Sequence, residues 1–398
     1  MKHPEIASVV FSYYPADPRV RRESEAMVES GASVDVFCLK QEHESKHETV
    51  NGVNVYRIPL QRRRGAKVRY LFEYLAFITM AFFYLAFYTI KSFKNRYAIV
   101  HIHNMPDVLV FSSLIPRLLG AKIILDLHDP MPEVFMAKYS WPDRHPAVLF
   151  LQYLEKISIR YSHVVLTPNK AFQRLFTSRG CPPGKIHIVM NAPQESIFGS
   201  PPSSSSFSPP FSGEKPLQIM YHGTITERNG LGVALEALQI LKEEYPKWIL
   251  HVYGEGDFLE TFLKKKSELG LDDHVVYHGY APAEKIAAAL REIDIGLIPN
   301  QASVHWDHAF PTRLFEYLSQ GKPVIAPRTR GILDYFDEQS LYLFESGDAV
   351  SLAEALWKFL NQNDEDRRRM LHRGVETFRQ HRWIIQRRIL LEVVNSLV

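Results

Sequence analysis

The chain has 398 residues, 46% of them hydrophobic and 23% charged, which is the composition of a globular protein of two or three domains. Its formal net charge of +3 is too small to indicate a nucleic-acid-binding protein. Two cysteines, Cys38 and Cys181, cannot build a disulfide framework and fit a reducing compartment. The opening residues MKHPEIASVVFSYYP hold only one short apolar run, so we expect no signal peptide.

Short apolar runs alternate with helical patterns through the first half of the chain. We expect strands at residues 6–12, 34–39, 53–59, 98–103, 122–127, 164–167 and 187–189, and a helix over residues 20–30. Continuous apolar runs of this length are typical of strands that are buried on both faces. Their alternation with helices predicts an α/β fold with a doubly wound parallel sheet.

Residues 74–90 (YLAFITMAFFYLAFYTI) carry no charge and are just short of the length that spans a membrane. A single span would put the strands before and after it on opposite sides of the membrane, although both look like members of one sheet. We therefore expect a crossover helix over residues 68–93. It is either buried in the core or pressed against a bilayer beside the basic run 62–69 (RRRGAKVR), although charge runs are usually solvated surfaces.

Residues 196–215 (SIFGSPPSSSSFSPPFSGEK) are rich in Pro and Ser, have no periodicity and are predicted to be a linker or a long loop. A second alternating series follows, with strands at 217–221, 248–253, 275–277, 295–298 and 323–326 and helices at 230–244, 259–269, 283–290, 349–360 and 364–398. We expect Rossmann-like domains at 1–195 and 216–377 with a cleft between them, and a helix at about 378–398 that packs back on the first domain.

The stretch 305–326 (HWDHAFPTRLFEYLSQGKPVIA) is interpreted as a loop, a helix that Pro311 opens, and a turn into a strand. Free amides of Thr312, Arg313 and Leu314 at the positive end of this helix, together with the Arg313 guanidinium, form a potential anion site. One turn further on, the Glu316 carboxylate could accept hydrogen bonds from two hydroxyls of a ribose. These groups suit a nucleotide sugar, but a capped surface helix with an ordinary Arg and Glu fits them equally well.

Two further loops of the second half end strands. Residues 221–230 (YHGTITERNG) offer Gly223 for close backbone approach and Arg228 as a cation before a helix, but they lack the GK[ST] ending of a P-loop. The sequence Gly254-Glu255-Gly256 after the next strand is a weak signal, because any strand-to-helix turn can carry glycines.

In the first half, His128 stands directly after an apolar strand, with Asp129 and Glu133 following (LDLHDPMPE). A lone histidine is more often structural than catalytic, and here the two interpretations are nearly balanced. His101 and His103 alternate at the end of another strand and, with no third ligand nearby, are a poor case for a metal site.

The order of these motifs resembles the large GT4 family of retaining glycosyltransferases, which adopt the GT-B fold of two facing Rossmann-like domains. The resemblance covers nearly the whole chain. It depends on YYPADPRVRRE, LDLHDPMPE, VMNAPQESIF, YHGTITERNGLGVALEAL, YGEGDFLE, VVYHGY, IDIGLIP and FPTRLFEYLSQGKPVIA in this order. The subgroup that it resembles builds bacterial cell-surface polysaccharides.

The resemblance implies roles for particular residues. Glu316 matches the second glutamate of the family's EX7E motif, which binds the nucleotide ribose, and His128 matches the histidine that faces the donor sugar. Arg228 falls where the family places its basic pair against the diphosphate. His308 stands where the first EX7E glutamate is expected. Thr224 and Asn229 also depart from the basic residues that are frequent in the family, so these contacts are in doubt.

We thus expect a retaining, metal-independent transfer of a hexose or N-acetylhexosamine from a nucleotide diphosphate sugar, UDP-linked or else GDP-linked, without another cofactor. A hydroxyl of a glycan or polyprenyl-linked acceptor would attack the anomeric carbon from the leaving-group side. The catalytic residues would be His128 and Arg228. The donor-binding residues would be Gly223, Thr224, Arg228, Gly254, Glu255, Thr312, Arg313, Leu314 and Glu316, and the acceptor-side residues Tyr14, Arg19, Asp129 and Glu133.

The expected location is the cytoplasm, with peripheral contact to the inner membrane through about 62–93 and no nucleic-acid partner. Two other readings stay open. A GT-B nucleotide-sugar epimerase would bind the same donor and need no acceptor. A non-catalytic relative would bind a nucleotide sugar or glycan without turnover.

Overall fold

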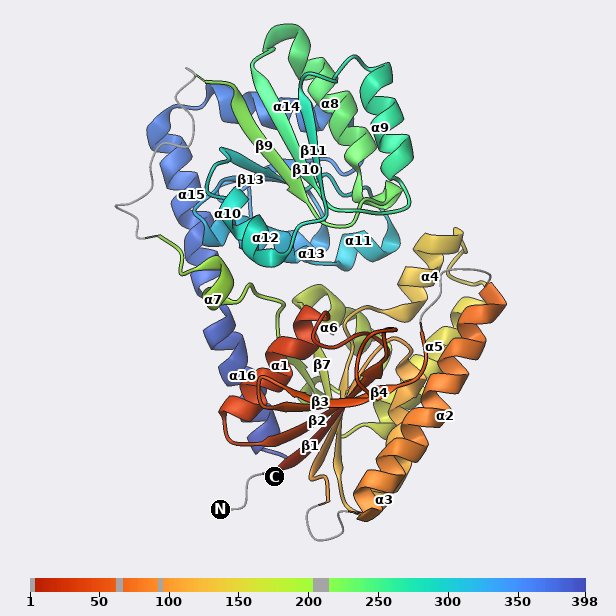
Figure 1. Ribbon diagram of the computed structural model, residues 1–398. Coiled ribbons are helices and arrows are strands. Elements are labelled where there is room, and N and C mark those ends of the chain that lie inside the picture. Colours follow the sequence, from red (N-terminus) through yellow and green to blue (C-terminus); the bar gives the residue numbers. More distant parts are fainter. Residues whose placement is uncertain (1–3, 62–66, 92–95, 203–214) are drawn as a thin grey trace. The chain divides into compact units, whose positions relative to one another are not determined.

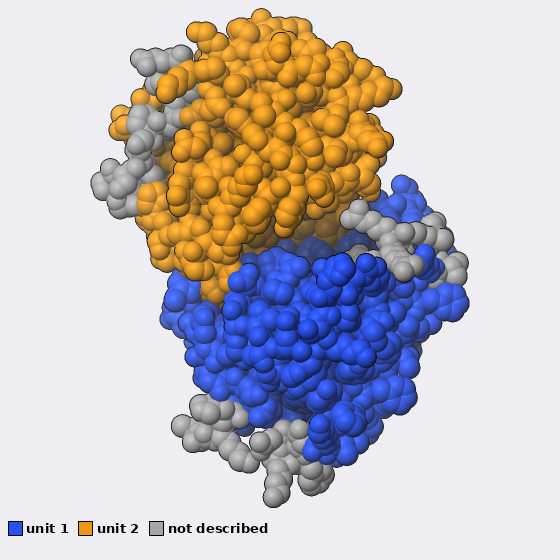
Figure 2. All heavy atoms as spheres, viewed as in Figure 1, with its two compact units in different colours: residues 1–190, 384–398 blue, residues 191–383 orange. Residues whose placement is uncertain are grey.

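The computed structural model describes residues 4–61, 67–91, 96–202 and 215–398 (Figure 1). Residues 62–66 of the predicted basic run and 203–214 of the predicted linker lie outside the described residues. The chain forms two compact units, coloured separately in Figure 2. Unit 1 comprises Met1–Met190 and Ile384–Val398, and unit 2 comprises Asn191–Trp383.

Unit 1 is built on an eight-stranded sheet in the order β3-β4-β2-β1-β5-β6-β7-β8. All neighbouring strands are parallel except β3 and β4. This confirms the predicted doubly wound sheet. The strands are β1 Glu5–Val10, β2 Ser33–Leu39, β3 His47–Val50, β4 Val53–Ile58, β5 Ile99–His103, β6 Lys122–Asp126, β7 Val164–Thr167 and β8 Ile186–Ile188.

The strand β3 was not predicted, because three of its four residues are exposed and it carries no apolar run. It joins β4 through Asn51 and Gly52, whose φ angles of 50° and 81° are those of a two-residue hairpin turn. The Asn-Gly pair in the sequence was the available signal for this hairpin.

The helices of unit 1 are α1 Pro18–Glu29, α2 Lys67–Lys91, the 3-10 helix η2 Asp107–Ser113, α3 Leu114–Leu118, α4 Met131–Tyr139, α5 Pro146–Tyr161, α6 Lys170–Ser178 and the 3-10 helix η3 Pro183–Lys185. The start of α1 is fixed by Asp17, whose side chain accepts hydrogen bonds from the amides of Arg19 and Val20, and by Pro18 in the first turn. Packing between α2 and η2 and between η2 and α5 places these helices on one side of the unit (Figure 1).

Helix α2 is the expected crossover between β4 and β5. It buries Phe77, Ala81 and Leu85, spaced four residues apart, while Phe83 and Phe87 are more than half exposed. The apolar window Phe72–Lys91 has a mean hydropathy of 1.5, but only 28% of it is buried. A fully buried core helix is therefore excluded, and one long side of α2 stays uncovered.

The last helix, α16 Trp383–Asn395, belongs mostly to unit 1. The Gln386 side chain accepts a hydrogen bond of 2.9 Å from the Met190 amide, and Arg387 forms an ion pair of 3.0 Å with Glu29. The single helix expected over residues 364–398 is two helices, and the break falls where the chain passes from unit 2 to unit 1.

Unit 2 has a parallel six-stranded sheet in the order β11-β10-β9-β12-β13-β14. Its strands are β9 Leu217–His222, β10 Trp248–Tyr253, β11 Val275–Gly279, β12 Ile295–Leu297, β13 Val324–Pro327 and the unpredicted β14 Tyr342–Phe344. Its helices are α7 Glu195–Phe198, the 3-10 helix η5 Glu227–Asn229, α8 Leu231–Glu244, α9 Leu259–Glu268, α10 Ala283–Ala289, α11 Val304–His308, α12 Thr312–Ser319, α13 Arg330–Leu333, α14 Ala349–Asn361 and α15 Asp364–Arg379.

The loop predicted before α12 is instead the short helix α11. The Ser303 side chain caps this helix by accepting a hydrogen bond from the Trp306 amide. Ser303 was therefore a local sequence signal for a helix start, but the apolar and aromatic residues beside it made this signal difficult to recognise.

Each sheet contains a point at which the strand order reverses, between β1 and β5 in unit 1 and between β9 and β12 in unit 2. Ligands of doubly wound sheets bind beside the carboxyl ends of the strands at such points. The functional residues are therefore sought at these two places.

Candidate functional site

In unit 2 the side chain of Arg313 reaches the carboxyl end of β9. Its Nη1 donates a hydrogen bond of 2.9 Å to the His222 carbonyl oxygen, and its guanidinium lies 4.7 Å from the centre of the Tyr221 ring. No ion pair of Arg313 with a carboxylate occurs within the part of the chain that the structure describes. The fold thus places a cation without a carboxylate partner at the strand-order reversal of unit 2.

One turn further along α12, a carboxylate oxygen of Glu316 lies 3.4 Å from Nε2 of His222. Burial, with the nearby Arg313 adding to it, lowers the pKa of His222 to about 3, so the imidazole is neutral. The carboxylate and the guanidinium therefore share one end of β9, as the predicted pairing of a ribose site with a diphosphate site requires.

Backbone groups of two glycines meet beside Arg313. Gly254 has a φ of 136°, and a Cβ on it would lie 1.9 Å from the Gly223 carbonyl oxygen. A Cβ on Gly223 would lie 3.3 Å from Nη1 of Arg313. Gly254 has no room for a side chain, and Gly223, with a φ of 131°, has a backbone conformation that residues with a side chain rarely adopt. The loops after β9 and β10 thus approach each other through glycine backbone.

The loop from Thr224 to Asn229 is held by its own side chains. The Tyr221 hydroxyl and the Asn229 side-chain amide both donate to the Thr224 carbonyl oxygen, at 2.7 and 2.6 Å. The Asn229 side chain thus stabilises the conformation of the loop, a role that the sequence did not indicate. Arg228 is exposed, and its side chain makes no hydrogen bond or ion pair with the described residues. Glu255 is also exposed.

The first turn of α12 differs in one respect from the prediction. The Leu314 amide donates to the Pro311 carbonyl oxygen at 3.0 Å, so it is used inside the turn and is not free for an anion. The Leu314 side chain is fully buried. The amides of Thr312 and Arg313 precede it in the helix, where helical geometry leaves amides without an intrahelical acceptor. His308 is half-buried, and its Nδ1 lies 3.0 Å from the Val304 carbonyl oxygen.

In unit 1 His128 follows β6 at the other strand-order reversal. Its backbone amide donates to the Asn104 side chain at 2.8 Å. Its Nε2 lies 3.0 Å from Oδ2 of Asp126 and 3.1 Å from Nδ1 of His103. Because Asp126 can only accept when it is ionised, Nε2 of His128 carries the proton. Nδ1 of His103 also lies 3.4 Å from Oδ2 of Asp126, and its Nε2 lies 3.0 Å from the Ser8 hydroxyl.

This arrangement leaves Nδ1 of His128 without a hydrogen bond to any residue in the described part of the chain, and the side chain is 18% exposed. Burial opposes the charged ring, but the Asp126 carboxylate outweighs it and raises the pKa of His128. One ring nitrogen of His128 is therefore free of hydrogen bonds to the described residues, while the other is anchored by Asp126, which stabilises the charged imidazole.

Asp126 is fully buried and held by Arg19. Nε and Nη2 of Arg19 donate to its two carboxylate oxygens, both at 2.8 Å, and Nη1 donates to the Val189 carbonyl oxygen at 2.8 Å. Burial alone would raise the pKa of Asp126, but Arg19 and His128 hold it well below its usual range. Asp126 was not predicted as a component of the site, whereas Arg19 was predicted as an acceptor-side residue and not as the partner of Asp126.

His101 and His103 do have further potential ligands beside them, contrary to the expectation. Glu23 and Asp126 lie with them in one buried group whose candidate ligand atoms are all within 4.8 Å of one another. The Arg19 guanidinium contacts both carboxylates, at 2.8 Å from Asp126 and 3.2 Å from Glu23. A cation already neutralises this cluster, which therefore does not fit an additional metal ion.

Three predicted acceptor-side residues are not available to a substrate. Arg19 is 4% exposed and engaged as described, and Tyr14 is 1% exposed. Glu133 is 3% exposed and forms an ion pair with Arg179. The partners of Arg19 and Glu133 are distant in the sequence, so the sequence did not indicate that these two residues are buried in ion pairs. Asp129 is partly exposed, and its carbonyl oxygen accepts a hydrogen bond of 2.7 Å from Asn104.

Two family descriptions match the chain in the order of its units. "Glycosyl transferase 4-like domain" matches residues 16–192, and "Glycosyl transferases group 1" matches residues 205–376. The chain belongs to the GT4 family of glycosyltransferases. Its two parallel-sheet units are those of the GT-B fold.

Two of the similar proteins are named for amylovoran biosynthesis and for galactosyl transfer to lipopolysaccharide. The amylovoran biosynthesis glycosyltransferase AmsK of Erwinia amylovora is 31% identical over 208 residues, 52% of this chain and 49% of that protein. The lipopolysaccharide 1,6-galactosyltransferase of Escherichia coli is 23% identical over 274 residues, 65% of this chain and 69% of that protein. The matched region spans about half the length of the first of these relatives.

Two solved structures have folds that are similar to this one over nearly the whole chain. Sucrose-phosphate synthase from Thermosynechococcus elongatus has a TM-score of 0.77 at 17% identity, covering 99% of each chain. HepE of Anabaena, solved in complex with UDP and glucose, has a TM-score of 0.70 at 13% identity, covering 99% of this chain and 100% of that one.

Proposed function

We propose that this protein is a retaining glycosyltransferase that moves a hexose or N-acetylhexosamine from a nucleotide diphosphate sugar to a hydroxyl of a glycan or polyprenyl-linked saccharide in surface polysaccharide synthesis. The observation that carries the proposal is the convergence of Arg313, Glu316 and the bare backbone of Gly223 at the end of β9. UDP is the preferred nucleotide and GDP the second, since HepE, which has the same fold, was solved with UDP.

Unit 2 binds the donor in this proposal. The ribose hydroxyls donate to the Glu316 carboxylate, and the diphosphate lies against Arg313 and the amides of Thr312 and Arg313. Arg228 is exposed and its side chain has no partner among the described residues, and in this proposal it contacts the outer phosphate. These groups stabilise the negative charge that develops on the leaving nucleoside diphosphate.

The chemistry is a substitution at the anomeric carbon. The bond from that carbon to the diphosphate oxygen breaks, and a bond to the acceptor oxygen forms on the same face of the sugar. The proton of the acceptor hydroxyl passes to the leaving diphosphate. His128, protonated on Nε2 and anchored by Asp126, offers Nδ1 to a hydroxyl of the transferred sugar and positions it.

A metal ion is not part of the proposal, because guanidinium groups and helix amides supply the positive charge that the diphosphate needs. No cofactor beyond the nucleotide sugar is invoked. The cluster of ligand-type side chains in unit 1 has its charge neutralised by Arg19, so it serves His128 and not a metal.

The acceptor is placed on unit 1, and the protein acts in the cytoplasm at the inner membrane face. Support comes from the outer surface of α2, α3 and α5, where Phe83 is 63% and Phe150 is 60% exposed. Among the described side chains of these three helices, both acidic ones, Glu73 and Glu155, are buried. The basic ones reach the surface: Arg69, Lys91, Arg117, Lys156 and Arg160. An apolar surface with only basic charge suits an anionic bilayer.

The first experiment measures release of nucleoside diphosphate from a panel of UDP- and GDP-sugars, with and without EDTA. We expect release from one donor, unaffected by the chelator, and stimulation by a lipid-linked acceptor fraction. Loss of activity with EDTA would contradict metal independence. Interconversion of the free donor sugar would identify an epimerase instead.

The non-catalytic alternative has one observation in its favour, the presence of His308 where the family has a glutamate. Tight binding of a nucleotide sugar with no release of diphosphate, even with lipid-linked acceptors, would establish it.

A further inference from the structure

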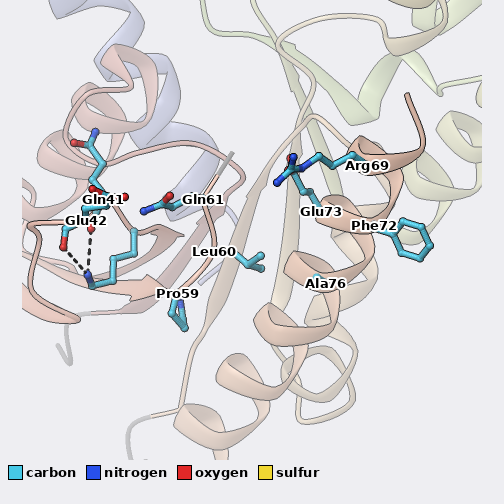
Figure 3. A pocket seen from close by; sticks show the side chains of 10 residues that line it. Gln41, Glu42, Pro59, Leu60, Gln61, Arg69, Phe72, Glu73 and Ala76 are labelled. Carbon is cyan, nitrogen blue, oxygen red and sulfur yellow. Dashed lines mark hydrogen bonds and ion pairs between the residues drawn. The ribbon is translucent and has the colours of Figure 1, made fainter. Parts of the chain in front are cut away.

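Unit 1 contains a pocket of about 620 Å³ that none of the proposed catalytic or donor-binding residues lines (Figure 3). It lies between the segments that follow β2 and β4 and the first turns of α2, at the carboxyl edge of the sheet. The volume is within the range of about 300–1,000 Å³ that is typical of sites for small ligands.

The polar part of the lining is electrically balanced. Lys40 donates to the carbonyl oxygens of Gln41 and Glu42 at 3.1 and 3.4 Å, and Arg69 pairs with Glu73 at 3.2 Å. The lining contains the cations Lys40 and Arg69 and the carboxylates Glu42 and Glu73, so it favours no net charge on a ligand. Carboxamides such as that of Gln61 both donate and accept, which suits a neutral polyhydroxylated ligand better than a phosphate.

The apolar part of the lining leads out of the pocket. Phe72 lines it, is 66% exposed, and begins the row of exposed apolar residues along α2 that includes Leu75, Phe83 and Phe87. These positions share one helix face because they follow the spacing of helical turns. A ligand with a sugar in the pocket can thus lay an apolar chain along α2.

We propose that this pocket binds the saccharide of an acceptor that carries an apolar chain, with the sugar between Gln61 and Arg69 and the chain leaving across Phe72. The inference rests on the proposed function for its place in the reaction. Binding itself does not, because it requires neither the donor nor turnover.

The test uses n-octyl glycosides below their micelle concentration, with glucose, galactose or N-acetylglucosamine as the sugar. Binding to the full-length protein is followed by saturation-transfer NMR and titration calorimetry. We expect at least one glycoside to bind, and Gln61→Ala and Phe72→Ser each to weaken it tenfold or more. Phe87→Ser is the matched control, since it changes the same residue type on the same face of α2, about 22 Å further along the helix.

Three results would overturn the proposal: binding by no glycoside of the panel, equal binding by the two pocket variants, or equal binding of n-octylphosphocholine, which has the chain without a sugar. Thermal unfolding of each variant reports its folding, and all three altered side chains are surface-accessible. Nucleotide binding by the wild-type protein is measured separately, so a failure of the donor assignment is distinguishable from a failure of the pocket.

Discussion

Replacing Asp126 with Asn tests the buried centre of unit 1 most directly. The variant keeps the shape of the side chain but removes the charge that faces Arg19 across two hydrogen bonds of 2.8 Å. Breaking one side of a buried ion pair costs about 3–5 kcal/mol because the other charge stays buried. Glu23, 3.2 Å from the same guanidinium, remains as a partial partner, so we expect about 3 kcal/mol. For a unit of this size that lowers Tm by about 6–12 °C.

The pH dependence of this loss has a defined sign. The pKa of Asp126 is depressed in the folded protein, so its contribution to stability is present above the unfolded value of about 3.9 and is lost as the pH falls toward the folded pKa. The difference between wild type and Asp126→Asn should therefore be full at pH 6 and shrink below pH 4. The pKa of His128, raised mainly by Asp126 against the effect of burial, should fall in the variant.

Differential scanning calorimetry measures the stability, and NMR titration of the histidine side chains measures the pKa. Asp143→Asn, an exposed aspartate of the same unit, is the control and should change stability by less than about 0.5 kcal/mol. Wild-type stability in Asp126→Asn, together with an unchanged His128 titration, would refute the assigned network.

Three other outcomes are expected. Glu316→Ala should weaken donor binding about 10- to 100-fold by removing a charged acceptor of two ribose hydroxyls, and calorimetry with UDP and GDP measures it; unchanged affinity would remove the ribose role. Gly254→Ala should destabilise unit 2 and weaken donor binding, because its Cβ would lie 1.9 Å from the carbonyl oxygen of Gly223. Gly270→Ala, also at positive φ but with open space, should cost less in thermal unfolding. Burial raises the pKa of Glu155 to about 8 despite a neighbouring guanidinium, so stability should fall as the pH rises from about 4.3 through 8. Glu155→Gln should flatten that slope in urea titrations, and an unaltered slope would count against it.

The sheets were predictable because buried parallel strands are continuous apolar runs. The bounds of β7 and β10 were predicted to the residue, and those of the other predicted strands to within two residues. The strands β3 and β14 escaped prediction for a physical reason. One is largely exposed and the other has only three residues, so neither produces an apolar run long enough to stand out.

The proximity of Arg313 and Glu316 at one strand end could be predicted because these residues are close in the sequence. Arg313 and Glu316 lie on one helix, one turn apart, directly after the loop that brings them to β9. The partners of Arg19 could not be inferred in this way. Asp126 is 107 residues from it in the sequence, and no local spacing indicates that pairing. The same holds for Glu133 and Arg179, which are 46 residues apart.

The two units use arginine in opposite ways at equivalent places in their sheets. At the reversal between β1 and β5, Arg19 is buried and bound to a carboxylate, so it adds no positive field for a substrate. At the reversal between β9 and β12, Arg313 contacts a carbonyl oxygen and an aromatic ring, and none of the described carboxylates forms an ion pair with it, although Glu316 lies one turn away on the same helix. An anionic diphosphate gains much from the second environment and little from the first. A neutral saccharide has no such preference, and the charge-balanced pocket of unit 1 suits it. This difference in the ion pairing of the two arginines supports our proposal that unit 2 binds the donor and unit 1 the acceptor.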